Sequence, residues 1–279
     1  MAGTKDAADA LSADWLGLCR RAAEGVRGAL AAHPSTSERS ATTSRGKGGD
    51  MTLVIDRAAE DAVFSELEEL GAPLTAVSEE RGEVVIAGGG PVHVVIDPID
   101  GSLNAKRALP FHCLSIAVAA GSTMADVELG YVADLHIGEE WWARRAEGAF
   151  RDGVRLAPPP DGEPELELLG VESADPRLVR ASAEALAATG AHRLRAYGSI
   201  ALQLCEVAAG DLDAMLSLAP SRSVDAAAGQ LLVREAGGVV SFPDTGLDPL
   251  AAGLGLDMRS RVVAARGPAV LDRLVAGLD

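Results

Sequence analysis

A proline-rich stretch at residues 157–164 divides the chain into two patterns of predicted secondary structure. Upstream, apolar runs separated by short turns, one of them at 148–153, predict successive strands and favour an antiparallel sheet. These strands are expected at 113–120, 126–133, 140–144 and 154–156. Downstream, strands alternate with helices, which is typical of an α/β arrangement. Those strands are expected at 166–171, 194–197, 213–218, 239–241 and 262–265, and the helices at 175–189, 199–209, 223–235 and 267–278. The sequence therefore predicts an N-terminal α+β lobe over residues 1–157 and a C-terminal α/β lobe over 158–279.

The N-terminal part begins with a predicted helix, because residues 6–33 carry apolar side chains at helical spacing. Residues 34–49 are rich in Ser, Thr, Arg, Lys and Gly, and we expect a flexible loop there. Whether this loop orders over a functional site stays open. A strand is expected at 74–78, followed by a Gly-rich loop at 81–91 that leads into a second strand at 92–96.

Charge and cysteine content restrict the partners and the compartment. The 25 Lys and Arg against 41 Asp and Glu give a net charge of −16, which argues against nucleic acid or an anionic membrane as the main partner. Three Cys lie far apart in apolar contexts, which predicts reduced, buried thiols rather than a disulfide framework or a zinc site. With no secretory signal and no apolar run long enough to span a bilayer, we expect a cytoplasmic protein.

The segment 97–104, Asp-Pro-Ile-Asp-Gly-Ser-Leu-Asn, follows the apolar strand at 92–96. Pro98 removes a backbone donor, so we expect the strand to end there. Gly101 permits a tight turn and a close approach by a ligand. Asp97 and Asp100 would then converge just past the strand, and paired carboxylates of this kind suit Mg²⁺ with a substrate phosphate. A solvated turn is the alternative interpretation of this motif taken alone.

Further acids stand at the ends of other predicted elements. Glu79 follows the strand at 74–78, and Asp225 begins a helix whose next residues, 226–229, are small. The helix dipole alone would explain an acid at that position. Asp56 and Glu60 lie one helical turn apart, where an ordinary solvated helix face is the simpler interpretation.

Four of these carboxylates form a set, those of Glu79, Asp97, Asp100 and Asp225. Their negative charge matches the positive charge of two or three Mg²⁺ ions, which would let an acidic protein hold a phosphate ester. The N–H groups of Gly101 and Ser102 could cradle that phosphate. His93 and His112 lie in apolar runs and are interpreted as structural, and the sequence contains neither a phosphate-binding P-loop nor a nucleophile elbow.

Two motifs in this order resemble the signatures of the inositol monophosphatase/fructose-1,6-bisphosphatase superfamily, the Mg²⁺-dependent, Li⁺-sensitive phosphatases. The first is the segment 97–104, and the second is Val-Asp-Ala-Ala-Ala-Gly at 224–229, followed by Glu-Ala-Gly-Gly at 235–238. The segments 50–60 and 195–202 fit as well, so that the resemblance covers residues 45 to 265.

The resemblance implies a layered α-β-α-β-α sandwich with an antiparallel sheet in the first half and a smaller mixed sheet in the second. It implies a homodimer. It also implies that Mg²⁺ is held by the carboxylates of Glu79, Asp97, Asp100 and Asp225 and by the backbone carbonyl of Ile99. It implies that Glu79 and Ser102 orient the attacking water, while Asp56 accepts a hydrogen bond from the Ser102 hydroxyl. The implied substrate-binding residues are Asp100, Gly101, Ser102, Arg195, Ser199, Ile200 and Arg222.

Two departures from the family pattern bear on the substrate. Val224 stands where a Trp often precedes the last Asp, and residues 217–220 supply no Glu of the kind found in inositol-specific members. Arg222 stands three residues before Asp225, which is more similar to the archaeal-type branch that acts on both fructose 1,6-bisphosphate and inositol phosphates. Arg222 and Arg195 would hold a second phosphate or sugar hydroxyls, although a surface ion pair explains Arg222 equally well.

The sequence thus predicts a Mg²⁺-dependent phosphomonoesterase for a small sugar or cyclitol phosphate. A phosphatase of a 3′-phosphonucleotide or of histidinol phosphate is the alternative within this class. A catalytically silent, metal-binding relative is the alternative outside it, and the complete acid set argues against that alternative.

Overall fold

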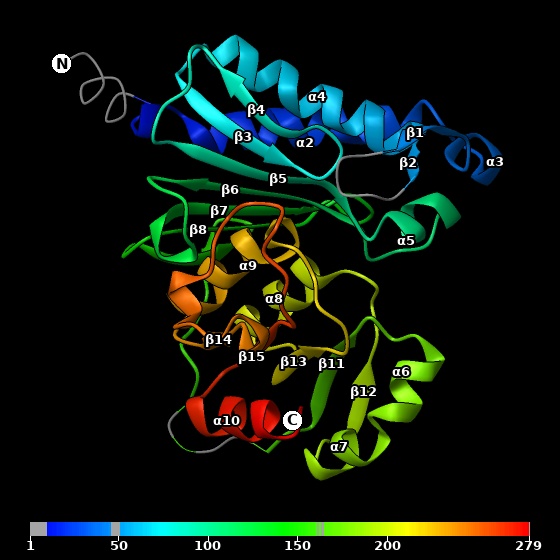
Figure 1. The fold of residues 1–279 in the computed structure, drawn as a ribbon, viewed down its shortest axis with the longest axis vertical. Helices are drawn as coiled ribbons and strands as arrows, with labels where there is room; N and C mark the ends of the chain where they lie inside the picture. Colours follow the sequence, from blue (N-terminus) through cyan, green and yellow to red (C-terminus); the bar gives the residue numbers. More distant parts are fainter. Residues whose placement is uncertain (1–9, 46–50, 161, 163–164, 279) are drawn as a thin grey trace.

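The computed structural model describes residues 10–45, 51–160, 162 and 165–278, and it shows five layers in the order α, β, α, β, α (Figure 1). The first layer holds α2 (Trp15–Ala31) and α4 (Val54–Leu70), which pack on the larger sheet. The middle layer holds α8 (Ile200–Ala209) and α9 (Ser223–Glu235), between the two sheets. The last layer holds α6 (Pro176–Ala181), α7 (Ala183–Ala188) and α10 (Pro268–Ala276). The predicted layered sandwich is therefore confirmed.

The larger sheet has eight strands in the order β10-β9-β8-β7-β6-β5-β3-β4. Every neighbouring pair is antiparallel except β3 and β5, which run parallel, so this sheet is mixed rather than purely antiparallel. The parallel pair matters because it brings the carboxyl ends of two strands to one edge. The strands are β3 (Leu74–Ser78), β4 (Gly82–Ile86), β5 (His93–Asp100), β6 (Cys113–Ala119), β7 (Val127–Asp134), β8 (Glu140–Arg144), β9 (Gly148–Arg151) and β10 (Val154–Arg155).

The smaller sheet has five strands in the order β12-β11-β13-β15-β14. The first three are parallel and the last two pairings are antiparallel, as predicted for a smaller mixed sheet. The strands are β11 (Leu168–Glu172), β12 (Arg193–Arg195), β13 (Ala214–Ser217), β14 (Val239–Ser241) and β15 (Val263–Ala265). The division of the chain into lobes at residue 157 stays a prediction.

Several predicted elements differ in the structure. The segment 34–49, predicted to be a loop, contains α3 (Thr36–Arg39) and β1 (Thr42–Arg45), which pairs with β2 (Met51–Leu53); residues 46–50 lie outside the described residues. The Gly-rich segment 81–91 contains β4, and the turn expected at 148–153 contains β9. Both strands were missed because they are held by hydrogen bonds to a neighbouring strand. A Gly-rich or short run shows no clear strand pattern by itself. The helix expected at 175–189 is divided into α6 and α7 at Ser182.

The first predicted helix begins later than expected. Asp14 caps α2 by accepting a hydrogen bond from the Gly17 N–H at 3.0 Å, so this helix starts at Trp15. Residues 6–9 of the predicted span lie outside the described residues. Among the described helices, none is both long and apolar enough to cross a membrane.

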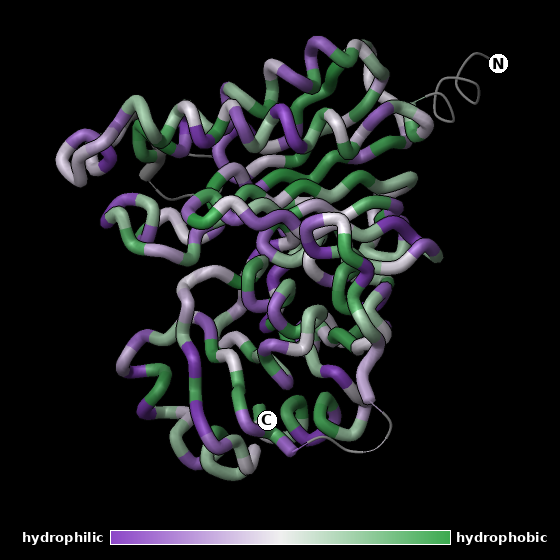
Figure 2. The backbone as a smooth tube through the Cα atoms, turned by 180° about the vertical axis from the view of Figure 1, so that it is seen from behind, coloured by the Kyte–Doolittle hydropathy of each residue, from purple (hydrophilic) through white to green (hydrophobic). Residues whose placement is uncertain are grey.

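Three hydrophobic cores lie between the five layers. One joins α2 and α4 to the larger sheet, the second joins that sheet to α8, α9 and the smaller sheet, and the third joins the smaller sheet to α7 and α10. Seen from behind, hydrophobic residues follow the strands in the middle of the molecule (Figure 2). The α9 helix is nearly surrounded by other elements, as ten of its residues are buried.

Small residues let α9 approach its neighbours closely. A Cβ atom added to Gly130 of β7 would lie 2.5 Å from the Ala228 carbonyl oxygen. A Cβ added to Gly229 would lie 2.6 Å from Leu204 of α8. The small residues at 226–229 thus allow close packing of α9, and this packing carries Asp225 toward the ends of the strands.

Replacing Gly130 with Ala should destabilise the fold, because the new methyl carbon would overlap the α9 backbone. Overpacking of this kind lowers the free energy of unfolding by about 1–3 kcal/mol. Gly28→Ala is the matched control, since Gly28 is exposed in α2 with no atom within 4 Å of the added carbon. That control should gain about 0.5–1 kcal/mol. Urea unfolding measures both, and a Gly130→Ala protein as stable as the wild type would contradict the close packing.

Candidate metal centre and substrate pocket

A β-bulge in β5 turns Asp97 and Asp100 to the same face of the larger sheet. Asp97 pairs with Ser115 and Asp100 pairs with Cys113, so three steps along β5 face two steps along β6. In a regular strand, residues three apart point to opposite faces; one extra residue reverses that relation. The expectation that Pro98 ends the strand is therefore wrong: the strand runs through Pro98 to Asp100, because a bulge tolerates a residue without a donor.

The parallel register of β3 and β5 places Glu79 beside Asp97. Ser78 pairs with Ile96, so the residue after each lies at the same edge of the sheet. Asp225 reaches this point from the first turn of α9, where its Oδ2 accepts a hydrogen bond from the Arg222 N–H at 2.8 Å. One carboxylate oxygen from each of Glu79, Asp97 and Asp225 lies within 4.8 Å of the other two. We call these three residues the acidic cluster.

Asp100 lies beside the acidic cluster but has other partners. Its Oδ2 accepts hydrogen bonds from the Ser199 hydroxyl and the Ala201 N–H, both at 2.7 Å. Ile99 is buried; its N–H donates to Asp97 Oδ1 at 3.1 Å, and its carbonyl accepts from the Ser102 hydroxyl at 2.8 Å. The structure thus groups all five predicted ligands around the bulge, three of them with converging side-chain oxygens.

Asp56 and Ser102 border a separate cavity that Glu79 of the acidic cluster also lines. This cavity has a volume of about 380 Å³, and Glu80 and Lys106 line it as well. The buried Asp56 accepts a hydrogen bond from the Leu53 N–H at 3.2 Å, and its Oδ1 has no hydrogen-bond partner among the described residues. Burial raises the pKa of Asp56 to about 6, and the Leu53 N–H and, to a smaller extent, the Ser102 side chain oppose that rise.

Gly101 adopts a left-handed conformation, with φ of +87°, directly before α5 (Ser102–Arg107). An added Cβ would also lie 2.6 Å from the Phe111 carbonyl oxygen. Both facts require Gly at this position. The turn that follows the bulge therefore depends on Gly101 to bring Ser102 back toward the Ile99 carbonyl.

Burial raises the pKa of every Asp that borders the centre. Burial and then repulsion from Asp100 raise the pKa of Asp97, and burial and then repulsion from Asp225 raise the pKa of Asp100 to about 8. Burial also raises the pKa of Asp225, against the Arg222 N–H and the charge of Arg222. Buried carboxylates that repel one another favour either protons or a cation between them. This donor set, all oxygen, fits a hard divalent metal ion.

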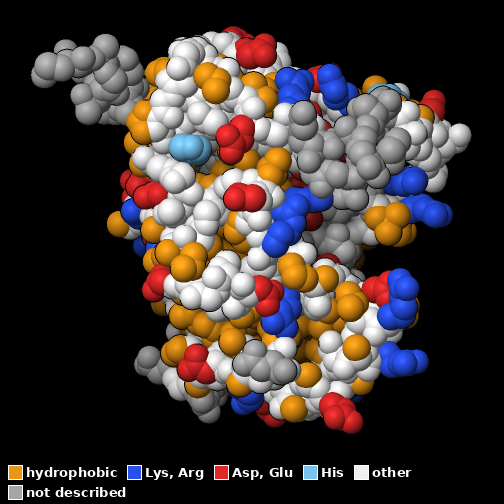
Figure 3. Space-filling view, viewed as in Figure 1, with side chains coloured by type: hydrophobic (Ala, Val, Ile, Leu, Met, Phe, Trp, Pro, Cys, Tyr) orange, Lys and Arg blue, Asp and Glu red, His pale blue; other side chains and the backbone are white. Residues whose placement is uncertain are grey.

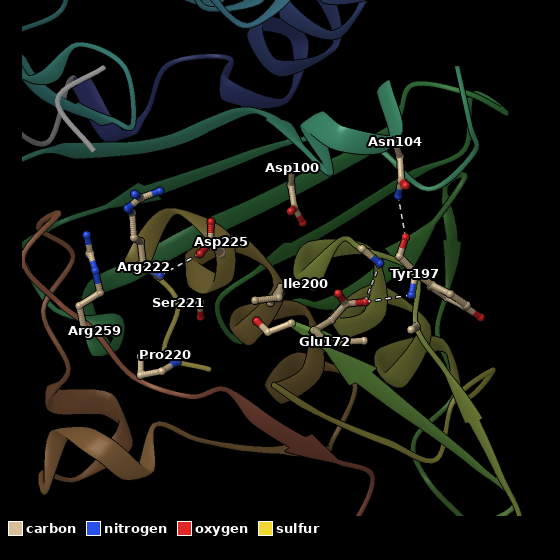
Figure 4. A pocket seen from close by; sticks show the side chains of 14 residues that line it. Asp100, Asn104, Glu172, Tyr197, Ile200, Pro220, Ser221, Arg222, Asp225 and Arg259 are labelled. Atoms are coloured by element: carbon tan, nitrogen blue, oxygen red, sulfur yellow. Dashed lines mark hydrogen bonds between the residues drawn. The ribbon is translucent and has the colours of Figure 1, made fainter. Parts of the chain in front are cut away.

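The main pocket has a volume of about 580 Å³ and opens beside the acidic cluster. Figure 4 shows Asp100 and Asp225 pointing into it, Arg222 and Arg259 together on one side, and Glu172 on the other. On the surface, Lys and Arg side chains gather beside the hollow between α5 and α6 (Figure 3). A pocket with acids at its base and two arginines at one wall suits a metal ion and an anionic substrate.

The predicted substrate residues separate into two groups. Asp100, Ile200 and Arg222 line the main pocket. Ser199 lies behind them, and its hydroxyl donates a hydrogen bond to Asp100. Arg195 is exposed and lies outside the lining; its guanidinium donates to the Leu194 carbonyl at 2.9 Å. Arg222 forms an ion pair with Glu79 of the acidic cluster, and this pair lies at the pocket with both side chains mostly buried. The role of Arg222 toward the substrate stays a prediction.

The sequence did not reveal three further residues of the pocket. Arg259 comes from the loop before β15, and no motif marks it. Glu172 ends β11 and accepts hydrogen bonds from the N–H groups of Tyr197 and Gly198, at 3.0 and 2.9 Å. Asn104 donates to the Tyr197 carbonyl at 2.6 Å from the opposite side. Glu172 could have been suspected as an acid at a strand end, the same signal that marks Glu79.

Together these features describe a metal-dependent phosphatase, a phosphoric monoester hydrolase. The model of the inositol monophosphatase family matches residues 11–278, and the chain belongs to this family. The family inferred from the two motifs is thereby confirmed.

The sequence relatives include archaeal and bacterial proteins. A Methanothermobacter thermautotrophicus protein described as fructose-1,6-bisphosphatase/inositol-1-monophosphatase is 33% identical, over 95% of this chain and 96% of its own. A Haemophilus influenzae protein described as Nus factor SuhB is 33% identical, over 81% of this chain and 84% of its own.

Among solved structures, one described as inositol monophosphatase-fructose 1,6 bisphosphatase superposes with a TM-score of 0.79 at 24% identity. The match covers 95% of this chain and 100% of that one. A Thermotoga maritima protein described as IMPase gives a TM-score of 0.76 at 24% identity, over 95% of this chain and 97% of its own. These likenesses confirm the fold.

Without metal, the raised pKa of Asp100 predicts that the protein loses stability as the pH rises. Folded Asp100 keeps its proton up to a pH of about 8, whereas an ordinary Asp releases it near 3.8. The folded state thus binds more protons in this window, so the free energy of unfolding falls from about pH 4 to about pH 8. Thermal unfolding in EDTA measures the slope, and Asp100→Asn should flatten it while keeping an oxygen for Ser199. Equal slopes for the two proteins would contradict the assignment.

Proposed function

We propose that this chain hydrolyses a small sugar or cyclitol phosphate with Mg²⁺ held by the acidic cluster, Asp100 and the Ile99 carbonyl. The observation that carries the proposal is the convergence of one oxygen each from Glu79, Asp97 and Asp225 within 4.8 Å. Two or three Mg²⁺ ions would balance the charge of these carboxylates. Bound Mg²⁺ would lower the pKa of a water molecule and neutralise charge on the phosphate.

The protein's own groups would orient the reactants. Ser102, held by the Ile99 carbonyl, and Glu79 would direct the attacking water, and Asp56 would take part through the Ser102 hydroxyl. The N–H groups of Gly101 and Ser102 precede a short turn of helix and would donate to the phosphate oxygens. Asp100, fixed by Ser199 and the Ala201 N–H, would hold its carboxylate toward the leaving-group side.

The main pocket supports substrates of the inositol monophosphate or fructose 1,6-bisphosphate type. Relatives carry names with both activities. Arg222 and Arg259 stand on one wall, where a second phosphate or sugar hydroxyls would bind. Because Arg195 lies outside the lining, Arg259 takes the place beside Arg222 that the sequence had suggested for Arg195; a role for Arg195 stays a prediction.

The remaining expectations concern the setting of the enzyme. A cytoplasmic location is supported by three free, buried cysteines, which suit a reducing compartment. A homodimer is proposed from the family resemblance, and light scattering after gel filtration tests it. Nucleotide or histidinol phosphate substrates, and a silent relative, are outcomes that the activity test distinguishes.

Phosphate release is the direct test of the proposed function. The panel contains inositol 1-phosphate, fructose 1,6-bisphosphate, a 3′-phosphonucleotide and histidinol phosphate, each with Mg²⁺, with EDTA, and with Mg²⁺ plus Li⁺. We expect Mg²⁺-dependent, Li⁺-sensitive turnover of one or both of the first two. Turnover of the nucleotide or of histidinol phosphate alone would overturn the substrate class, and Mg²⁺ binding without turnover of any compound would indicate the silent relative.

Replacing Arg259 with Gln should raise the KM for fructose 1,6-bisphosphate, because a charge-assisted hydrogen bond to the second phosphate is lost. Such a bond contributes about 1.5–3 kcal/mol, so we expect a KM about tenfold higher or more. The KM for inositol 1-phosphate, which has a single phosphate, should stay within about twofold. Arg259 is preferred to Arg222 for this test because Arg222 also contacts Glu79. An equal rise after Arg195→Gln, with none after Arg259→Gln, would contradict the assignment.

A further inference from the structure

Glu60 of α4 is a buried carboxylate that the proposed reaction does not use. It lies one helical turn after Asp56, and its side chain has no exposed surface. Taken alone, the sequence favoured a solvated helix face for Asp56 and Glu60, and that interpretation is wrong because both residues are buried. A buried charge costs several kcal/mol unless it is paired and hydrogen-bonded. Its partners therefore indicate what its burial accomplishes.

Among the described residues, the hydrogen-bond partners of Glu60 are Ser78 and Arg81, at the connection from β3 to β4. The Ser78 hydroxyl donates to Glu60 Oε1, and the Arg81 N–H donates to the same oxygen at 3.2 Å. The Arg81 Nε donates to Glu60 Oε2 at 3.1 Å. Glu60 thus binds the turn at both ends, and Glu79 lies between those ends, directly after Ser78.

Arg81 is itself held against α4. Its guanidinium lies 4.2 Å above the centre of the Phe64 ring, one helical turn beyond Glu60. It also pairs with the exposed Asp61. A single helix therefore supplies all three contacts that hold Arg81 against α4.

We infer that Glu60 is a positioning residue that fixes the metal ligand Glu79 through the turn 78–81. This inference rests on the proposed function, since it takes Glu79 as a ligand. The register of Ser78 with Ile96 sets Glu79 beside Asp97, but it does not fix the direction of the residues after Ser78. The bonds from Glu60 fix that direction and hold the Glu79 oxygen within reach of Asp97 and Asp225. Partners of this kind, outside the ligand set itself, typically change metal affinity or activity by about 10–100-fold when they are replaced.

The test measures Mg²⁺ binding to the full chain by calorimetry, apart from any activity. Glu60→Gln keeps one oxygen for Ser78 and the Arg81 N–H but loses the charge that faces Arg81 Nε. We expect its Mg²⁺ dissociation constant to rise about tenfold or more. The kcat should recover at saturating Mg²⁺, because the reacting groups are intact and only the position of one ligand is loosened.

Two further variants separate positioning from charge and from stability. Ser78→Ala leaves the charge of Glu60 in place and removes one hydrogen bond, so the dissociation constant should rise about fivefold. Because this change removes only a hydroxyl, it also serves if Glu60→Gln does not fold. Asp61→Asn is the matched control, since it removes a neighbouring exposed acid that pairs with Arg81 and Arg57 but lies outside the bonds between Glu60 and the turn. Its dissociation constant should stay within about twofold of the wild type.

Unchanged Mg²⁺ affinity in Glu60→Gln or Ser78→Ala would overturn the inference. So would an Asp61→Asn protein weakened as much as Glu60→Gln, because the effect would then be one of charge alone. A lower kcat that saturating Mg²⁺ does not restore, with unchanged affinity, would show a purely structural role. Failure of the proposed metal site is distinguishable, since the wild-type protein itself would then bind no Mg²⁺. Failure of the proposed substrate class would leave the Mg²⁺ affinities of wild type and variants measurable.

Discussion

Repulsion among buried carboxylates is the constraint on which this structure depends. Asp97, Asp100 and Asp225 come from a bulged strand and a helix start, and burial raises the pKa of each. Without a cation, the repulsion among these carboxylates would be relieved by their protonation or by opening of the fold. A divalent cation relieves it without either, and it leaves a net attraction for phosphate. An acidic protein can in this way bind an anionic substrate at the point where its own negative charge is most concentrated.

Strand pairing and helix packing bring these acids together. The parallel pairing of β3 with β5 aligns Glu79 with Asp97, and the bulge in β5 turns Asp100 to the same face. The α9 helix lies between the sheets and carries Asp225 to that edge; Gly130 lets its backbone approach β7. The strand pairing, the bulge and the helix thus each position part of the acid set, and the candidate metal centre is assembled from both halves of the chain.

The sequence predicted the elements more reliably than their geometry. The helices expected from residues 175 and 199 begin there as α6 and α8, where Asp175 and Ser199 are the N-caps, because caps act locally. The passage of β5 through Pro98 was missed, since a bulge depends on pairing with β6. Burial of Glu60 was missed because its partners, Ser78 and Arg81, follow 18 and 21 residues later. Arg259 was missed for the same reason: it reaches the pocket through tertiary packing, which no local pattern encodes.

Anomalous scattering from a crystal grown with Mn²⁺, a substitute for Mg²⁺ at oxygen sites, tests the central claim most directly. The account predicts an anomalous peak in contact with carboxylate oxygens of Glu79, Asp97 and Asp225, and loss of that peak in Asp97→Asn. A peak that persists in this variant, or Mn²⁺ bound only at residues outside the acidic cluster, would contradict the account.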